Sequence, residues 1–124
     1  MDNVVLENLE IYQLALEIGE IVWKNVEKWE WFVKKTVGSQ FTEAADSISA
    51  NIAEGYGRYF YKDRRVFCYY SRGSLLESKN WATKALNRQL MSQAEYDVLI
   101  EKMKTLHHKL NIYIKKLNEN IAQA

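Results

Sequence analysis

The sequence predicts an all-α protein whose single domain, residues 1–124, folds as an antiparallel up-down-up-down four-helix bundle. Proline is absent and there are only five glycines, so the chain has few of the turn residues that separate short strands. Long stretches instead repeat apolar residues every three or four positions, which is the period of an amphipathic helix. Four such stretches joined by short links pack most simply side by side.

The first predicted helix covers residues 6–29, and the second covers residues 38–56. One apolar stripe runs along the first helix: Ile11, Ala15, Ile18, Val22 and Val26. The second helix is rich in small side chains: Ala44, Ala45, Ser47, Ser49, Ala50 and Ala53. Small side chains let a neighbouring helix approach closely, and we expect the aromatic third helix to be that neighbour.

The third predicted helix covers residues 63–87, with Asp63 as its N-cap. The fourth follows Ser92, which we expect to be an N-cap, and Glu95 three positions later completes a capping box. Apolar residues of the fourth helix alternate spacings of three and four, as in a packed bundle. They are Tyr96, Leu99, Met103, Leu106, Leu110, Tyr113 and Leu117.

Composition and charge narrow the class of protein. Hydrophobic residues make up 48% and charged residues 27% of the chain, as in a folded protein. The sequence has neither a signal-peptide pattern nor an apolar run long enough to span a bilayer, so we expect a cytoplasmic location. The net charge is +1, but residues 1–54 hold ten acids and four bases, and residues 55–124 hold six acids and thirteen bases. The second half can therefore meet phosphates, or the acidic half of another copy.

The sequence predicts no catalytic residue, no metal and no cofactor. The Glu-x-x-His motif of bundle iron proteins is absent, and the adjacent His107 and His108 point about 100° apart on a helix. Cys68 is the only cysteine and lies in an aromatic run, where a buried thiol is expected. The Walker pattern is also absent around Gly55 and Gly57, so we expect one of these glycines to end the second helix in a left-handed conformation.

Two acids stand among apolar or small residues, Glu54 in the second helix and Glu77 in the third. Burial of a carboxylate requires a partner. We expect a partly buried ion pair with Arg58 or Arg72, which would fix the register of the helices.

The stretch from residue 58 to residue 72 interleaves five bases and one acid with aromatic rings. Bases and rings together can bind nucleic acid, because cations meet phosphates while rings stack on bases. The candidate contacts are Arg58, Lys62, Arg64, Arg65 and Arg72. In the alternative interpretation, Phe67 and Tyr70 are core residues, and the arginines are solvated or paired with acids of a neighbouring subunit.

Residues 51–58, Asn-Ile-Ala-Glu-Gly-Tyr-Gly-Arg, and residues 73–77, Gly-Ser-Leu-Leu-Glu, form a recognisable signature. The chain resembles the bacterial four-helix-bundle family encoded in intervening sequences of large-subunit ribosomal RNA genes, often labelled the S23 ribosomal protein family. It is also similar to the accessory variability proteins of diversity-generating retroelements. The motif residues are Asn51, Glu54, Gly55, Gly57, Arg58, Gly73, Ser74 and Glu77.

The resemblance implies an antiparallel bundle that assembles as a homo-oligomer, a pentameric ring, with no enzymatic activity. It also implies binding of RNA or another nucleic acid, because the retroelement proteins work with a reverse transcriptase. The sequence leaves open a second function, a protein-interaction scaffold without nucleic acid, in which the basic half meets the acidic half of a neighbouring subunit.

Overall fold

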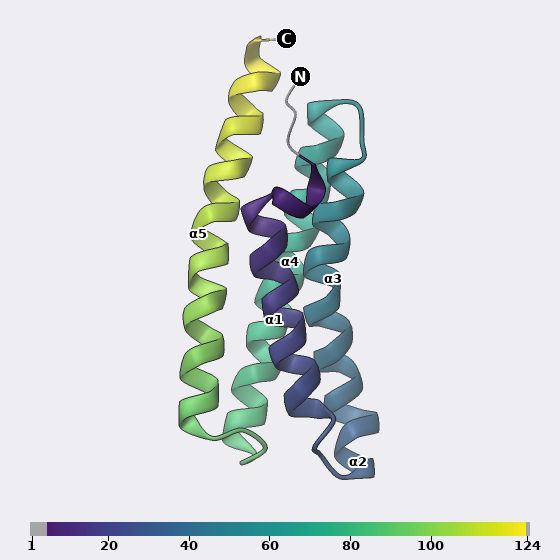
Figure 1. The fold of residues 1–124 in the computed structure, drawn as a ribbon, viewed down its shortest axis with the longest axis vertical. Coiled ribbons are helices and arrows are strands. Elements are labelled where there is room, and N and C mark those ends of the chain that lie inside the picture. Colours follow the sequence, from purple (N-terminus) through teal and green to yellow (C-terminus); the bar gives the residue numbers. More distant parts are fainter. Residues whose placement is uncertain (1–4, 124) are drawn as a thin grey trace.

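A computed structural model describes residues 5–123, which form four long helices and short helical turns (Figure 1). A 3-10 turn, η1 (Leu6–Asn8), precedes α1 (Glu10–Val26). A one-turn helix, α2 (Trp31–Val33), continues through a π-helical turn, η2 (Lys34–Gly38), into α3 (Ser39–Tyr56). The two longest helices are α4 (Tyr61–Asn87) and α5 (Gln93–Gln123). Residues 5–123 contain no β-strand.

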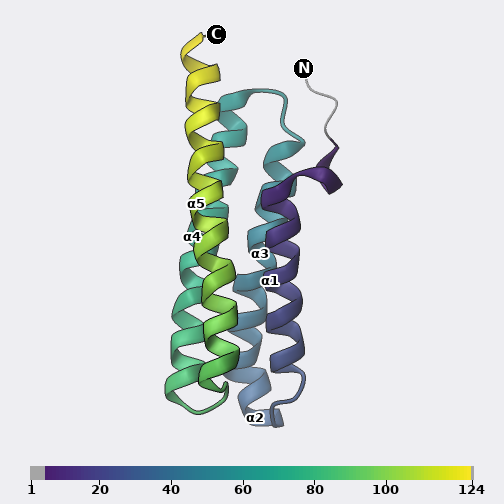
Figure 2. The same ribbon diagram turned by 60° about the vertical axis from the view of Figure 1, so that its left-hand side comes forward.

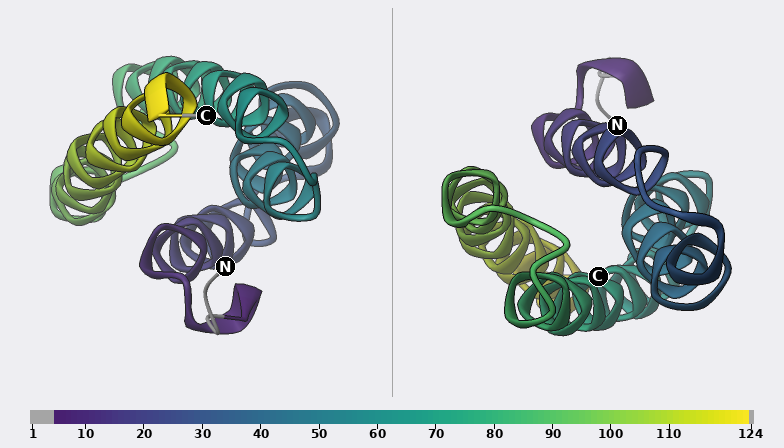
Figure 3. Two further views of the ribbon diagram at one scale, coloured as in Figure 1. Left: turned by 90° about the horizontal axis from the view of Figure 1, so that it is seen from above. Right: turned by 90° about the horizontal axis from the view of Figure 1, so that it is seen from below.

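The four long helices run antiparallel in chain order, which confirms the predicted four-helix bundle (Figure 2). Viewed along the bundle, α3 lies between α1 and α4, and α5 lies beside α4 (Figure 3). The start of α1, the α3–α4 turn and the end of α5 share one end of the bundle, the upper end in Figure 1. The long helices are amphipathic, and none within residues 5–123 is long and apolar enough to cross a membrane.

The core is formed by the predicted apolar stripes. All five stripe residues of α1 are buried, and so are the five aliphatic stripe residues of α5: Leu99, Met103, Leu106, Leu110 and Leu117. Tyr96 and Tyr113 are half-buried at the edge of this core. Each helix therefore buries one face, as the period of its apolar residues predicts.

Close packing of α3 against α4 depends on small residues, as the sequence predicts. A Cβ atom added to Gly55 would lie 2.8 Å from the Cβ of Phe67 and 3.2 Å from the carbonyl oxygen of Arg64. Deeper in the bundle, the buried Ser71 hydroxyl of α4 donates a hydrogen bond of 2.9 Å to the carbonyl of Ile48 in α3. The two backbones therefore approach closely enough for a short side chain to bridge them.

The predicted bounds of the first helix are wrong, and those of the second are confirmed. The first expected helix breaks at Leu9, which is extended (φ −76°, ψ 117°), and α1 ends at Val26. The second predicted helix, residues 38–56, agrees with α3, but the sequence did not predict α2 and η2, which precede α3 without a break. A Cβ atom on Gly38, the N-cap of α3, would lie 2.7 Å from Val26, so this glycine allows close packing of η2 against α1.

The caps agree with the sequence at one of the three expected positions. The Ser92 N–H donates to the Glu95 carboxylate at 2.8 Å, and the Glu95 N–H donates to the Ser92 hydroxyl at 3.1 Å, which confirms the capping box. Asp63 is not an N-cap, because α4 begins earlier, at Tyr61, and Asp63 lies in its first turn. Gly57 follows the last residue of α3 but has φ −76°, so the expected left-handed glycine is absent from this turn.

Candidate nucleic-acid interface

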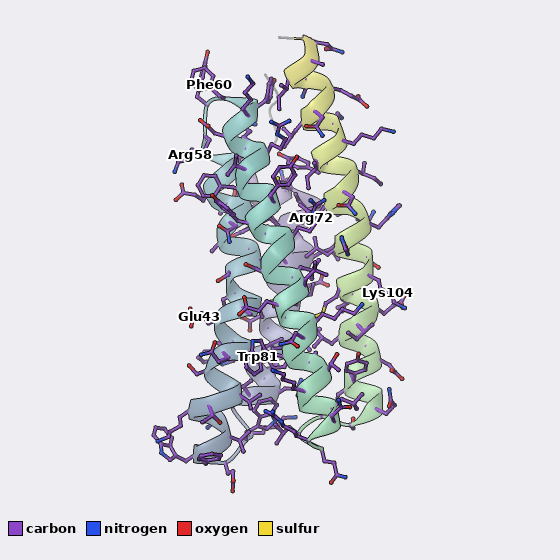
Figure 4. All side chains as sticks on the ribbon, turned by 180° about the vertical axis from the view of Figure 1, so that it is seen from behind. Glu43, Arg58, Phe60, Arg72, Trp81 and Lys104 are labelled. Carbon is purple, nitrogen blue, oxygen red and sulfur yellow. The ribbon has the colours of Figure 1, made fainter. Side chains whose placement is uncertain are left out.

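The five basic candidates do not form one compact patch. Arg58 and Arg64 pack around the turn between α3 and α4, and Lys62 is exposed in the first turn of α4. Arg65 and Arg72 reach toward α5 on the other side of α4. Figure 4 shows Arg58 beside the α3–α4 turn and Arg72 between α4 and α5. The separation follows from helix geometry, because side chains seven residues apart share a face and side chains one residue apart do not.

Arg58 pairs with Glu54 one helical turn away, at 3.7 Å, and its guanidinium lies 4.8 Å from the ring centre of Phe67. Both partners are about half-exposed, with 46% of the Arg58 and 57% of the Glu54 side chain accessible. The expected pairing of Glu54 with Arg58 is therefore confirmed, but its burial is not, because both residues are exposed at the end of α3. Glu77 is exposed too and forms no ion pair with another residue of the range 5–123.

Arg64 stabilises the α3–α4 turn. Its Nε donates a hydrogen bond of 2.8 Å to the carbonyl oxygen of Arg58. Its guanidinium also lies 5.4 Å from the ring centre of Tyr56 and 5.8 Å from that of Tyr61. The guanidinium therefore contacts groups of its own chain on several sides, and Arg64 has a structural role at this turn.

Arg65 and Arg72 are held by neutral partners on α5. Nη1 of Arg65 donates to the side-chain oxygen of Asn118 at 2.8 Å, and Nη1 of Arg72 donates to that of Asn111 at 2.9 Å. The Arg72 guanidinium also lies 5.2 Å from the ring centre of Tyr69. Neither arginine forms an ion pair within the described part of the chain. An amide orients a guanidinium without cancelling its charge, so both cations remain available to an external anion.

Exposed aromatic rings surround the end of the bundle that holds the α3–α4 turn. Tyr59 is 86% and Phe60 64% exposed in the α3–α4 turn. An open cavity of about 860 Å³ is lined by Tyr59, Phe60, Tyr61, Lys62, Asp63, Arg64 and Ile121. Phe67 is half-buried, but Tyr70 is 56% exposed, so the interpretation of both as core residues is wrong for Tyr70. This surface offers rings for stacking and cations for phosphates.

The described residues contain no group of three or more His, Cys, Asp or Glu side chains that could hold a metal ion. His107 is half-buried and His108 is exposed, in keeping with their different directions on α5. Cys68 is buried, as predicted. Burial raises the pKa of its thiol to about 11, although the charge of Arg72 acts in the opposite direction. Cys68 is therefore protonated and shielded at neutral pH.

Sequence reasoning did not find Asn111 and Asn118. The signal was present, because these asparagines are seven residues apart on α5 and their partners, Arg72 and Arg65, are seven apart on α4. Two antiparallel helices bring such positions together in pairs once their register is known. The register is a property of the folded bundle and cannot be derived from either helix alone.

The fold and its exposed basic and aromatic side chains define a small all-α bundle with an electropositive surface on its third long helix. The chain matches the model of the 23S rRNA-intervening sequence protein family over residues 7–112, and it belongs to this family. This confirms the resemblance seen in the sequence signature.

A solved structure from Bacteroides thetaiotaomicron, described as a protein of unknown function from the S23 ribosomal protein family, has the same fold. Its TM-score is 0.76 at 15% sequence identity, and the alignment covers 85% of this chain and 98% of that one. At this identity the likeness concerns the fold alone. No curated protein matches the chain.

Proposed function

We propose that this protein is a non-enzymatic, cytoplasmic homo-oligomer that binds RNA or another nucleic acid through basic residues of α4. The observation that carries the proposal is the pair of arginines, Arg65 and Arg72, which asparagines orient at the surface without neutralising them. Arg65 and Arg72 are half-buried, and Lys62 adds an exposed cation without an ion pair to a described residue. Arg58 and Arg64 contribute positive potential while they stabilise the α3–α4 turn.

The homo-oligomer is supported by a second apolar stripe on the outer face of α4. Val66, Tyr69, Gly73 and Leu76 alternate spacings of three and four, as in the seam between packed helices, and the polar Lys62 and Asn80 flank this stripe at the same spacing. Val66, Tyr69 and Leu76 on this stripe are 40%, 41% and 50% exposed. A Cβ atom on Gly73, midway along it, would have no neighbour within 4 Å. We propose that a helix of a second copy packs here, close to the backbone of Gly73.

Fluorescence anisotropy tests the nucleic-acid function. Labelled single-stranded RNA, duplex RNA and DNA are titrated at two salt concentrations with the wild type and with the Arg65→Gln/Arg72→Gln variant. We expect salt-sensitive binding by the wild type, and weaker binding with a shallower salt dependence by the variant. Lys24→Gln/Lys35→Gln is the matched control, because it removes two exposed positive charges from α1 and η2 without touching α4. Equal binding by all three proteins would remove the arginines from the interface.

An acidic surface supports the alternative, a protein-interaction scaffold. Glu20 of α1, Glu27 directly after α1, and Glu43 and Asp46 of α3 form no ion pair with any residue in the range 5–123. These acids complement the basic surface of α4, so two copies can meet through opposite charges. Light scattering at low and high salt separates the two kinds of contact between copies. An oligomer that dissociates at high salt favours charge-driven contacts, whereas an apolar interface along α4 persists.

A further inference from the structure

We infer that the basic surface continues as a straight track along the seam between α4 and α5, and that this track binds the phosphate backbone of a double-stranded nucleic acid. The inference rests on the proposed function and adds to it the extent of the surface and the form of the ligand. Two further lysines, Lys79 of α4 and Lys104 of α5, carry the extension, and neither is among the residues that the sequence pattern identified.

The register between α4 and α5 places these lysines. Arg65 contacts Asn118, and Arg72 contacts Asn111, so a step of seven residues along α4 matches a step of seven back along α5. The next step pairs position 79 with position 104. Lys79 and Lys104 both line a small cavity of about 30 Å³ between the two helices, which agrees with this pairing. The track therefore passes from two arginines to two lysines.

The track is straight and regularly spaced. Side chains seven residues apart lie on nearly the same face of a helix, about 10.5 Å apart along its axis. Arg65, Arg72 and Lys79 thus span about 21 Å of α4, and Lys104 lies beside the last of them on α5. Lys79 and Lys104 are exposed, and Figure 4 shows Lys104 nearer than Arg72 to the α4–α5 turn.

The lysines on the two sides of α5 differ in their partners. On the side that faces α1, Lys102 pairs with Glu17 at 3.0 Å and Lys109 pairs with Glu10 at 2.9 Å. On the side that faces α4, neither Lys79 nor Lys104 forms an ion pair with any residue in the described range 5–123. Glu101 lies one turn from Lys104 and does not pair with it. Positive charge therefore stays uncompensated along the α4–α5 seam.

The chemistry of the seam favours a duplex over a single strand. Single strands are usually held by rings that stack on successive bases. Among the described residues 5–123, Tyr69 is the one exposed ring in contact with a track cation, and Arg72 already lies over one of its faces. Fixed cations in a row suit a stiff, regularly charged backbone, which loses little freedom on binding. The exposed rings of Tyr59 and Phe60 lie in the α3–α4 turn at the end of the bundle, off this row.

Binding by Lys79→Gln/Lys104→Gln tests the track. Anisotropy is measured with duplex RNA of about 20 base pairs and with a single strand of the same length, and Lys24→Gln/Lys35→Gln again serves as the charge-matched control. We expect the wild type to bind the duplex more tightly. For Lys79→Gln/Lys104→Gln we expect binding to weaken by about tenfold at low salt. The slope of log K against log salt should become less steep by about 1.8, or 0.9 for each lysine. Unchanged circular dichroism checks the fold.

Four results would overturn the track, and the first three leave the wild type able to bind nucleic acid. If Arg65→Gln/Arg72→Gln makes the salt dependence of binding less steep and the lysine variant does not, the track does not extend to the lysines. The proposed function then still stands. If the single strand binds more tightly and Tyr59→Ala/Phe60→Ala abolishes that binding, the ligand lies at the bundle end. If the lysine variant changes the oligomer mass but not the affinity, the seam is a protein interface. A wild type that binds no nucleic acid overturns both proposals together.

Discussion

At the scale of single residues, two glycines of the sequence signature have opposite surroundings. Gly55 is buried at the closest approach of α3 and α4, where an added Cβ atom would lie 2.8 Å from Phe67. Gly73 is exposed on α4, where an added Cβ atom would meet nothing within 4 Å. The first glycine is therefore explained by packing within the subunit, and the second is not.

Alanine at the two positions is expected to act in opposite directions. Gly55→Ala should lower the free energy of unfolding, because overpacking costs about 1–3 kcal/mol, more than the helix gains from losing a glycine. Gly73→Ala should raise the stability of the isolated subunit by about 0.5–1 kcal/mol and weaken self-association along α4. Urea unfolding and light scattering measure the two effects. An unchanged oligomer mass for Gly73→Ala and for the bulkier Gly73→Leu would contradict the interface proposed at this glycine.

Asp46 supplies a pH-dependent prediction. Its pKa is raised above the ordinary 3.8, first by partial desolvation and then by the charge of Glu20. The carboxylate lies over Gly19, where an added Cβ atom would be 2.9 Å from Oδ1. A raised pKa means that the folded state holds the proton more tightly, so this group lowers stability as the pH rises through its titration range. We expect Asp46→Asn to raise the melting temperature at neutral pH and to have no effect below about pH 3. An equal gain at both pH values would indicate a cause other than ionisation.

At the scale of elements, α4 ends in a Schellman motif without a glycine. The Leu90 N–H donates to the Ala85 carbonyl at 2.8 Å, and the Gln89 N–H donates to the Leu86 carbonyl at 3.0 Å. Gln89 has φ 61°, a left-handed conformation that favours glycine. Gln89→Gly should therefore raise the free energy of unfolding by about 0.5–1 kcal/mol, as measured by urea denaturation. The neighbouring Arg88→Gly, at a residue with negative φ, is the control and should destabilise the protein.

The capping box of α5 predicts a second pH effect, with the opposite sign to that of Asp46. The pKa of Glu95 is lowered from 4.5, first by the hydrogen bond from the Ser92 N–H, and also by Lys28, which lies 3.7 Å away. A lowered pKa contributes stability that is present above the ordinary value and lost as the pH falls through the folded value. Ser92→Ala should cost about 1 kcal/mol at neutral pH. Glu95→Gln should destabilise at neutral pH but not below about pH 3; the same loss at both would show that its charge is unimportant.

The number and order of the long helices could be predicted from the sequence, because each long helix buries one apolar stripe. The bounds were less predictable where tertiary contacts decide them. The break at Leu9 lacks both proline and glycine, and the exposed Trp31 and Phe32 give no apolar period that marks α2. The left-handed conformation of Gln89 after α4 could not be predicted either, because glycine or asparagine is the usual residue in that conformation.

At the scale of the whole molecule, the candidate site was only partly predictable. The basic stretch that begins at Arg58 was visible in the sequence, but its division between two sides of α4 depends on the packing of α3 and α5. The track through Lys79 and Lys104 depends on the register of two helices whose contacts are far apart in the sequence. The sequence shows the charge of each residue and its position along one helix. Which residues of the neighbouring helix face it is decided only by the packing of the folded bundle.

The same packing separates charge between two surfaces of the bundle. Glu27 and Glu43 line one open cavity of about 420 Å³ between α1 and α3, together with the exposed Trp23. Lys34 lines the same cavity, but most bases of residues 5–123 that form no ion pair lie on α4 and α5. Removing acid from the first surface should therefore leave a nucleic-acid site on the second intact, and should slightly tighten it by reducing repulsion. Removing the same acid should disrupt an oligomer that joins acidic to basic surfaces.

The Glu27→Gln/Glu43→Gln variant separates these outcomes. We expect its oligomer mass to match that of the wild type by sedimentation, because the apolar stripe through Val66, Gly73 and Leu76 does not involve these acids. We also expect its affinity for duplex RNA to equal or exceed that of the wild type by up to about threefold, since long-range repulsion is screened at physiological salt. A variant that dissociates into subunits would assign the acidic surface to the contact between copies and would favour the scaffold function. The basic surface would then be covered in the oligomer, where no duplex could reach it.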